Sequence, residues 1–94
     1  LPVVRPGNLS AWAQYSIRVP DREAMRAHLE KSEIPTAVFY PIPLHLQPTY
    51  ADLGYEEADF PVCEKISKHI MSLPMHPYME EEVQERIVTA VGRR

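Results

Sequence analysis

The sequence contains little cysteine, little glycine and no long apolar run, and each scarcity excludes a class of protein. Its single cysteine, Cys63, cannot form an intramolecular disulfide and is typical of a reducing compartment. Its three glycines form no phosphate-binding loop. No stretch approaches the roughly 18 apolar residues that a membrane span needs, and no signal segment opens the chain. We therefore expect a cytoplasmic protein that does not cross a membrane.

Basic charge and metal-ligand spacing are lacking as well. The formal net charge is −3 and no basic face is visible, so we expect no nucleic-acid partner. The four histidines and Cys63 show none of the spacings Cys-x-x-Cys, His-x-x-x-His or His-Glu-x-x-His, so we expect no metal site. His28, His69 and Cys63 are interpreted as structural residues, with the cysteine buried or half-buried.

Proline, in contrast, is abundant. The chain has ten prolines among 94 residues, about twice the average usage of roughly 5%. The segment from Phe39 to Tyr50 concentrates three of them, and because proline fixes φ and lacks an N–H, it excludes a helix or a central strand there. We expect a stiff, ordered loop over 41–58, since loops of this length are usually functional or disordered and this composition is not that of a disordered segment.

Two residue types in this loop could contact a ligand. His45, on a rigid backbone, can donate or accept a hydrogen bond near neutral pH, although a plain surface histidine would look the same. Tyr40, Tyr50 and Tyr55 can stack on a base or donate to a phosphate, or can serve only in packing. Residue chemistry alone leaves both interpretations open.

The hydrophobic pattern predicts a small α+β domain. Alternating polar and apolar residues predict a strand over 11–19, and Asp21 is a suitable N-cap for the element that follows. Apolar spacing, β-branched residues and proline positions then predict the rest, in order: a helix over 22–32, a strand over 36–40, a helix over 59–73, an extended exit over 72–77 and a helix over 79–91 with Gly92 as its C′ residue.

Several blocks in order resemble the C-terminal end of the DegT/DnrJ/StrS-type aminotransferases, which use pyridoxal phosphate to aminate keto sugars attached to nucleotides. The blocks are Tyr40-Pro-Ile-Pro-Leu-His-Leu-Gln-Pro-Thr-Tyr50, Leu53-Gly-Tyr55, Asp59-Phe-Pro61 and Ser72-Leu-Pro-Met-His-Pro-Tyr78. The resemblance runs from about Trp12 to the end of the chain. It implies the small C-terminal domain of an aspartate-aminotransferase-like (fold type I) enzyme, with two to three antiparallel strands and about three helices.

The resemblance also implies a division of labour within a longer protein. Residues 1–10 would be a linker from a missing large domain, and 11–94 the small domain; a start at Leu1 without methionine suits an excised or processed piece. The family's cofactor lysine lies in the large domain, so we expect no catalytic residue, no bound cofactor and no activity in this chain alone. The parent would be a homodimer that transfers an amino group, usually from glutamate, in polysaccharide or antibiotic sugar biosynthesis.

By the same resemblance, Tyr40 and His45 are the expected substrate-binding residues. Tyr40 would contact the nucleotide sugar, and His45 would hydrogen-bond the substrate or hold the loop, with Gln47 a weaker candidate. Many relatives have histidine or tyrosine immediately before the Tyr-Pro step, where this chain has Phe39, which can neither donate nor accept a hydrogen bond.

Two other functions stay open. A free-standing α+β module could dock a partner protein through the proline-rich loop, and a sugar-nucleotide sensor could have lost its catalytic half. If the chain is part of an enzyme, an apolar patch should be exposed on the loop. The side chains expected in it are Leu44, Leu46, Tyr50 and Leu53.

Overall fold

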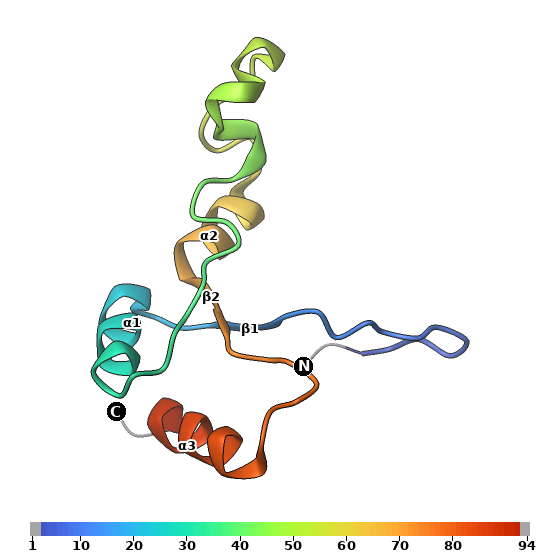
Figure 1. Ribbon diagram of the computed structural model, residues 1–94. Helices are drawn as coiled ribbons and strands as arrows, with labels where there is room; N and C mark the ends of the chain where they lie inside the picture. The colour runs from blue at the N-terminus through green and yellow to red at the C-terminus, as the bar shows by residue number, and fades with distance from the viewer. Residues whose placement is uncertain (1–2, 93–94) are drawn as a thin grey trace.

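The computed structural model describes residues 3–92; Leu1, Pro2, Arg93 and Arg94 lie outside this range. Its elements follow in the order β1 (Tyr15–Arg18), α1 (Arg22–Lys31), η1 (Leu44–Leu46), η2 (Pro48–Leu53), α2 (Pro61–His69), β2 (Ile70–Leu73) and α3 (Glu81–Gly92), where η denotes a 3₁₀ helix. Figure 1 shows α1 beside the two strands and α3 below them, with the green and yellow segment and α2 extending away in the opposite direction. The class is α+β, as predicted.

The sheet consists of β1 and β2, which pair antiparallel with Tyr15 opposite Leu73 and Arg18 opposite Ile70. β1 is shorter than the predicted strand over 11–19 because β2 offers only four residues to pair with. The second predicted strand, over 36–40, was wrong in extent. It reduces to one bridge, in which Ala37 and Ser72 exchange backbone hydrogen bonds of 3.1 and 2.8 Å, and Pro41, which has no N–H, follows soon after.

Helix α1 begins where the sequence predicts. The carboxylate of Asp21 accepts a hydrogen bond of 2.9 Å from the N–H of Ala24, as an N-cap residue does. Met25 and Leu29 are buried, as their spacing indicates. His28 is exposed on the same helix and its Nε2 donates to the carbonyl of Ala90, 3.0 Å away, which ties α1 to α3.

The helix predicted over 59–73 was wrong at its C-terminal end. α2 stops at His69, and Ile70 begins β2 with no intervening turn. The backbone groups of this segment bond instead to β1 on one side and to Ala37 on the other, so the sheet ends the helix. α3 begins at Glu81, two residues later than predicted, and includes Gly92 rather than ending before it.

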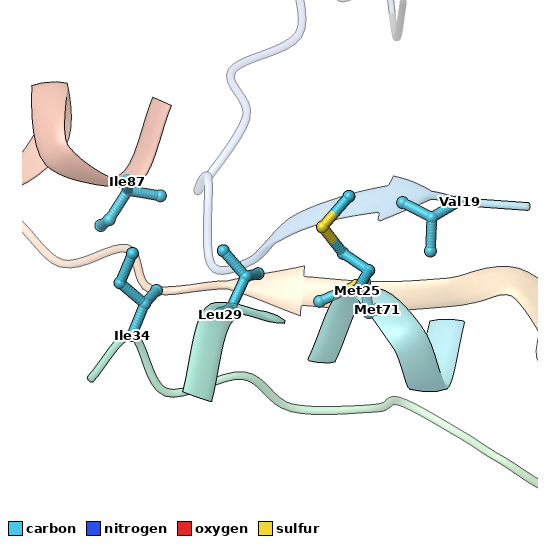
Figure 2. Close-up of a cluster of buried hydrophobic side chains, with 6 residues drawn as sticks. All are labelled: Val19, Met25, Leu29, Ile34, Met71 and Ile87. Atoms are coloured by element: carbon cyan, nitrogen blue, oxygen red, sulfur yellow. The ribbon is translucent and has the colours of Figure 1, made fainter. Parts of the chain in front are cut away.

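The core is small and lies at one end of the molecule. Figure 2 shows its buried side chains, contributed by the residue that follows β1, by α1 and the turn after it, by β2 and by α3: Val19, Met25, Leu29, Ile34, Met71 and Ile87. No buried hydrophobic side chain comes from the described residues between 35 and 66. That part of the chain is therefore ordered by other interactions.

The molecule is unusually open for its length. Its radius of gyration is 16.0 Å, whereas a compact domain of this length should have about 12 Å. Its accessible surface is 7931 Å², whereas a compact monomer of this mass exposes about 5,500 Å². The chain thus exposes about 2,400 Å² more than a closed domain would.

Candidate functional site

Residues 39–60 form an arm that extends from the sheet and returns to the start of α2 (Figure 1). Predicted to lack regular structure, the arm contains two short 3₁₀ helices, η1 and η2. Gly54 ends η2 with a φ of 72°, in the left-handed region that glycine adopts without strain. The side-chain amide of Gln47 donates to the carbonyl of Ile42 at 3.2 Å. The proline-rich segment is therefore held by its own local contacts.

The carboxylate of Glu64, on α2, is where the arm closes. It accepts hydrogen bonds from the N–H of Ala58 at 3.0 and 3.1 Å and from the N–H of Phe60 at 3.2 Å. His45 Nε2 lies 3.0 Å from Glu64 Oε1, and because a carboxylate only accepts, the imidazole donates. Ala58 has a φ of 75°, a conformation that costs a non-glycine residue about 1 kcal/mol or more, so these bonds help to retain it.

These contacts explain the electrostatics of the site. The hydrogen bond from Ala58 is the largest cause that lowers the pKa of Glu64 below its ordinary value, with smaller contributions from His45 and Phe60. Partial removal of the carboxylate from water raises the pKa of Glu64, but this effect is smaller than the combined effect of the hydrogen bonds, so the pKa is lowered overall. Glu64 is thus ionised at neutral pH and remains an acceptor for all three donors.

Three rings pack around the same point. The centroid of His45 lies 4.7 Å from that of Phe60 and 6.5 Å from that of Tyr55. Tyr55 and Phe60 are 5.1 Å apart in an edge-to-face arrangement, which aromatic pairs prefer. The arm therefore has a small aromatic cluster in place of a share in the core.

An open apolar groove of about 690 Å³ lies beside this cluster, between the beginning of the arm and α2. Its lining includes Phe39, Tyr40, Leu44, Phe60, Val62 and Ile66. Tyr40 is 62% exposed, and its ring meets that of Phe39 edge to face at 5.7 Å. A groove of this volume and composition can accept an apolar side chain or the flat face of a ring.

The two predicted site residues, Tyr40 and His45, have different surroundings in the structure. Tyr40 lines the groove, whereas the His45 side chain is only 8% exposed and its Nε2 is used by Glu64. Sequence reasoning missed Glu64, whose one local signal is an acidic residue in the first turn of a helix that begins with Pro61. Gln47 contacts the loop itself.

The exposure of Cys63 and of the apolar side chains on the arm can be compared with what the sequence predicts. Cys63 was expected to be buried or half-buried, which is wrong: it is exposed, because the first turn of α2 borders the open groove. On the arm, Leu44, Tyr50 and Leu53 are exposed as expected for an unpartnered patch, while Leu46 is half-buried.

Within residues 3–92, no three histidine, cysteine, aspartate or glutamate side chains cluster as metal ligands would. None of the helices in this range has the length and apolar character required to span a membrane.

Comparison with known proteins gives a consistent family. The chain is 45% identical over 86 residues to a pleiotropic regulatory protein of Geobacillus stearothermophilus, a match that covers 92% of this chain and 23% of the relative. It is 47% identical over 79 residues to the UDP-2-acetamido-2-deoxy-3-oxo-D-glucuronate aminotransferase of Pseudomonas aeruginosa, covering 84% and 21%.

A solved structure agrees with these sequence matches. The crystal structure of S. venezuelae DesV in complex with a ketimine intermediate superposes with a TM-score of 0.87 at 34% identity, over 97% of this chain and 24% of that one. The chain spans about a quarter of the length of the relatives it matches. The model of the DegT/DnrJ/EryC1/StrS aminotransferase family matches residues 2–92. This chain belongs to the DegT/DnrJ/EryC1/StrS aminotransferase family.

Proposed function

We propose that this chain is the small C-terminal domain of a nucleotide-sugar aminotransferase, in which residues 1–10 link it to a large domain. The complete enzyme transfers an amino group from an amino acid, with glutamate the expected donor, to a keto sugar attached to a nucleotide. The observation that carries the proposal is the family match over residues 2–92 in a chain that spans about a quarter of its relatives.

The family is pyridoxal-phosphate-dependent, and the residues of this chain do not fit that cofactor by themselves. The cofactor needs a lysine for its Schiff base and a cradle for its phosphate. Lys31, Lys65 and Lys68 are all exposed on helices, and the residues that line the groove include no lysine or arginine. We place the cofactor lysine outside this chain and expect the isolated chain to be inactive.

The open shape supports a role inside a larger assembly. An excess of about 2,400 Å² is similar to the surface that an obligate interface buries. Leu44, Tyr50 and Leu53 are exposed on the arm, in a part of the chain that contributes no buried hydrophobic residue to the core. In our proposal, the large domain and the second subunit of a homodimer cover this surface.

The two predicted site residues then have different roles. Tyr40, exposed and lining the groove, contacts the nucleotide sugar. His45, which is nearly buried and bonded to Glu64, holds the loop and does not contact the substrate.

Cofactor labelling tests the proposal directly. The full-length protein that carries this chain is reduced with borohydride in the presence of pyridoxal phosphate, and the labelled lysine is located by mass spectrometry. We expect one label outside this chain, together with glutamate-dependent amination of UDP- or dTDP-linked keto sugars. Stoichiometric labelling of Lys31, Lys65 or Lys68 would contradict the proposal.

The rival functions are weaker. Nothing in the comparisons favours a free-standing docking module. A regulatory sensor has some support in the relative from Geobacillus stearothermophilus, which is named a pleiotropic regulatory protein. Titration of this chain with UDP- and dTDP-sugars, followed by NMR at Tyr40, distinguishes a sensor from an enzyme domain. A sensor binds the sugar nucleotide on its own, whereas a domain that lacks most of its pocket does not.

A further inference from the structure

One carboxylate bonds to three residues where the arm returns to α2. We infer that Glu64 is the positioning residue of this region: it holds the returning arm against α2, and thereby holds open the groove to which Tyr40 belongs. The inference rests on the proposed function in one respect, that this groove is used to bind the nucleotide sugar.

The hydrogen bonds to the Glu64 carboxylate join separate parts of the chain. The three donors to Glu64 come from separate places in the chain: His45 in η1, Ala58 at the end of the arm, and Phe60 immediately before α2. The N–H groups of Ala58 and Phe60 lie outside the hydrogen-bond ladder of α2, so each needs an acceptor from a side chain or from water. With a side chain only 15% exposed, Glu64 supplies that acceptor where water has little access.

Phe60 connects the Glu64 carboxylate to the groove. Phe60 donates its N–H to Glu64, packs its ring against His45 at 4.7 Å, and lines the groove together with Tyr40. Glu64 itself is not among the lining residues. It therefore acts on the groove through Phe60 and His45, without touching whatever binds there.

The number of donors explains why the residue is a glutamate. All three donors lie within hydrogen-bond distance of Oε1, and the N–H of Ala58 also reaches Oε2 at 3.0 Å, so the ionised carboxylate shares them between its two oxygens. Glutamine has nearly the same size but one acceptor oxygen with two lone pairs, too few for three donors, and its NH₂ group in place of Oε2 would face the N–H of Ala58. Glu64→Gln is therefore a near-isosteric change that should release part of the arm.

The test combines a structural and a functional measurement. In this chain, hydrogen exchange followed by NMR at the amide of Ala58, which bonds to both oxygens, should accelerate at least about tenfold in Glu64→Gln, as expected for the loss of a hydrogen bond to a charged group; the amide of Phe60, which bonds to Oε1 alone, should change less. Unchanged signals from the core residues show that the variant remains folded. The matched control is Glu56→Gln, which removes an exposed carboxylate from the same arm that is not adjacent to either amide and should change neither.

In the full-length protein, Glu64→Gln should raise KM for the nucleotide sugar about tenfold while kcat changes much less, because the residue positions the binding groove and does not take part in chemistry. His45→Gln, which keeps a side-chain donor, should be milder than His45→Phe. Unchanged exchange at Ala58, or an unchanged KM, overturns the inference and leaves the proposed function intact. Failure of the unmodified protein to aminate any nucleotide-linked keto sugar overturns the proposed function, and the exchange measurement still reports on Glu64.

Discussion

Two leucines on opposite parts of the molecule should respond very differently to the same substitution. Leu29, on α1, is 0% exposed and belongs to the core cluster together with Met71 of β2 and Ile87 of α3. Leu53 is 64% exposed at the end of η2 on the arm. Leu29→Ala and Leu53→Ala remove the same atoms, so any difference between them reports the surroundings alone.

The expected magnitudes follow from burial. A fully buried leucine costs about 2–5 kcal/mol when it is truncated to alanine, and we take about 3 kcal/mol for Leu29 because its core is small. A domain of this length is stable by about 5–14 kcal/mol, and the open shape of this chain places it near the lower end. Leu29→Ala should therefore remove about half of the stability, whereas Leu53→Ala should change it by less than about 0.5 kcal/mol.

Urea unfolding monitored by circular dichroism measures both values. With a slope of about 1 kcal/mol per molar urea, at the low end for small proteins, the midpoint should fall by about 3 M for Leu29→Ala and by less than about 0.5 M for Leu53→Ala. Equal shifts, or a loss below about 1 kcal/mol at Leu29, would refute a core confined to the strands, α1 and α3.

Three further predictions concern single contacts. Asp21→Ala should cost about 1 kcal/mol through loss of the α1 N-cap, while Asp21→Asn should cost little; equal losses in urea unfolding would exclude the cap. The hydroxyls of Ser16 and Ser72 are 2.9 Å apart and Ser72 is 5% exposed, so a double-mutant cycle to alanine should show the pair costing less than the sum of the two single changes, and strict additivity would contradict the pairing. The carboxyl carbon of Glu64 and the amide of Ala58 should titrate together by NMR, with a pKa below the ordinary 4.5. Because folding lowers this pKa, the stabilisation is complete above the unfolded value and is lost as the pH falls through the folded one; a midpoint at or above 4.5 would disprove the contact.

The sequence predicted those elements whose signals are local. Asp21 marked the start of α1, and the spacing of Met25 and Leu29 marked its buried face. The end of α2 could not be found in this way, because the apolar spacing that includes Ile66 and Ile70 continues without a break from helix into strand. What ends the helix is pairing with a strand more than fifty residues earlier in the chain, and a short apolar run does not reveal such pairing.

The candidate site was predictable only in part for the same reason. The concentration of prolines drew attention to the loop, and the family resemblance singled out Tyr40 and His45, which lie in the arm. Glu64 escaped notice because its importance comes from donors that folding brings to it, one of them 19 residues away along the chain. An acidic residue in the first turn of a helix is otherwise unremarkable.

The direct passage of α2 into β2 has a mechanical consequence. Arg22 donates through Nη1 to the carbonyl of Ser67, and His69 Nδ1 donates to the carbonyls of Val19 and Pro20 at 3.2 and 3.1 Å, so the base of α2 is fastened to the sheet and to α1. Because no loop separates α2 from β2, a change in the direction of α2 must also disturb the sheet, and a force applied along α2 is transmitted directly to the strands.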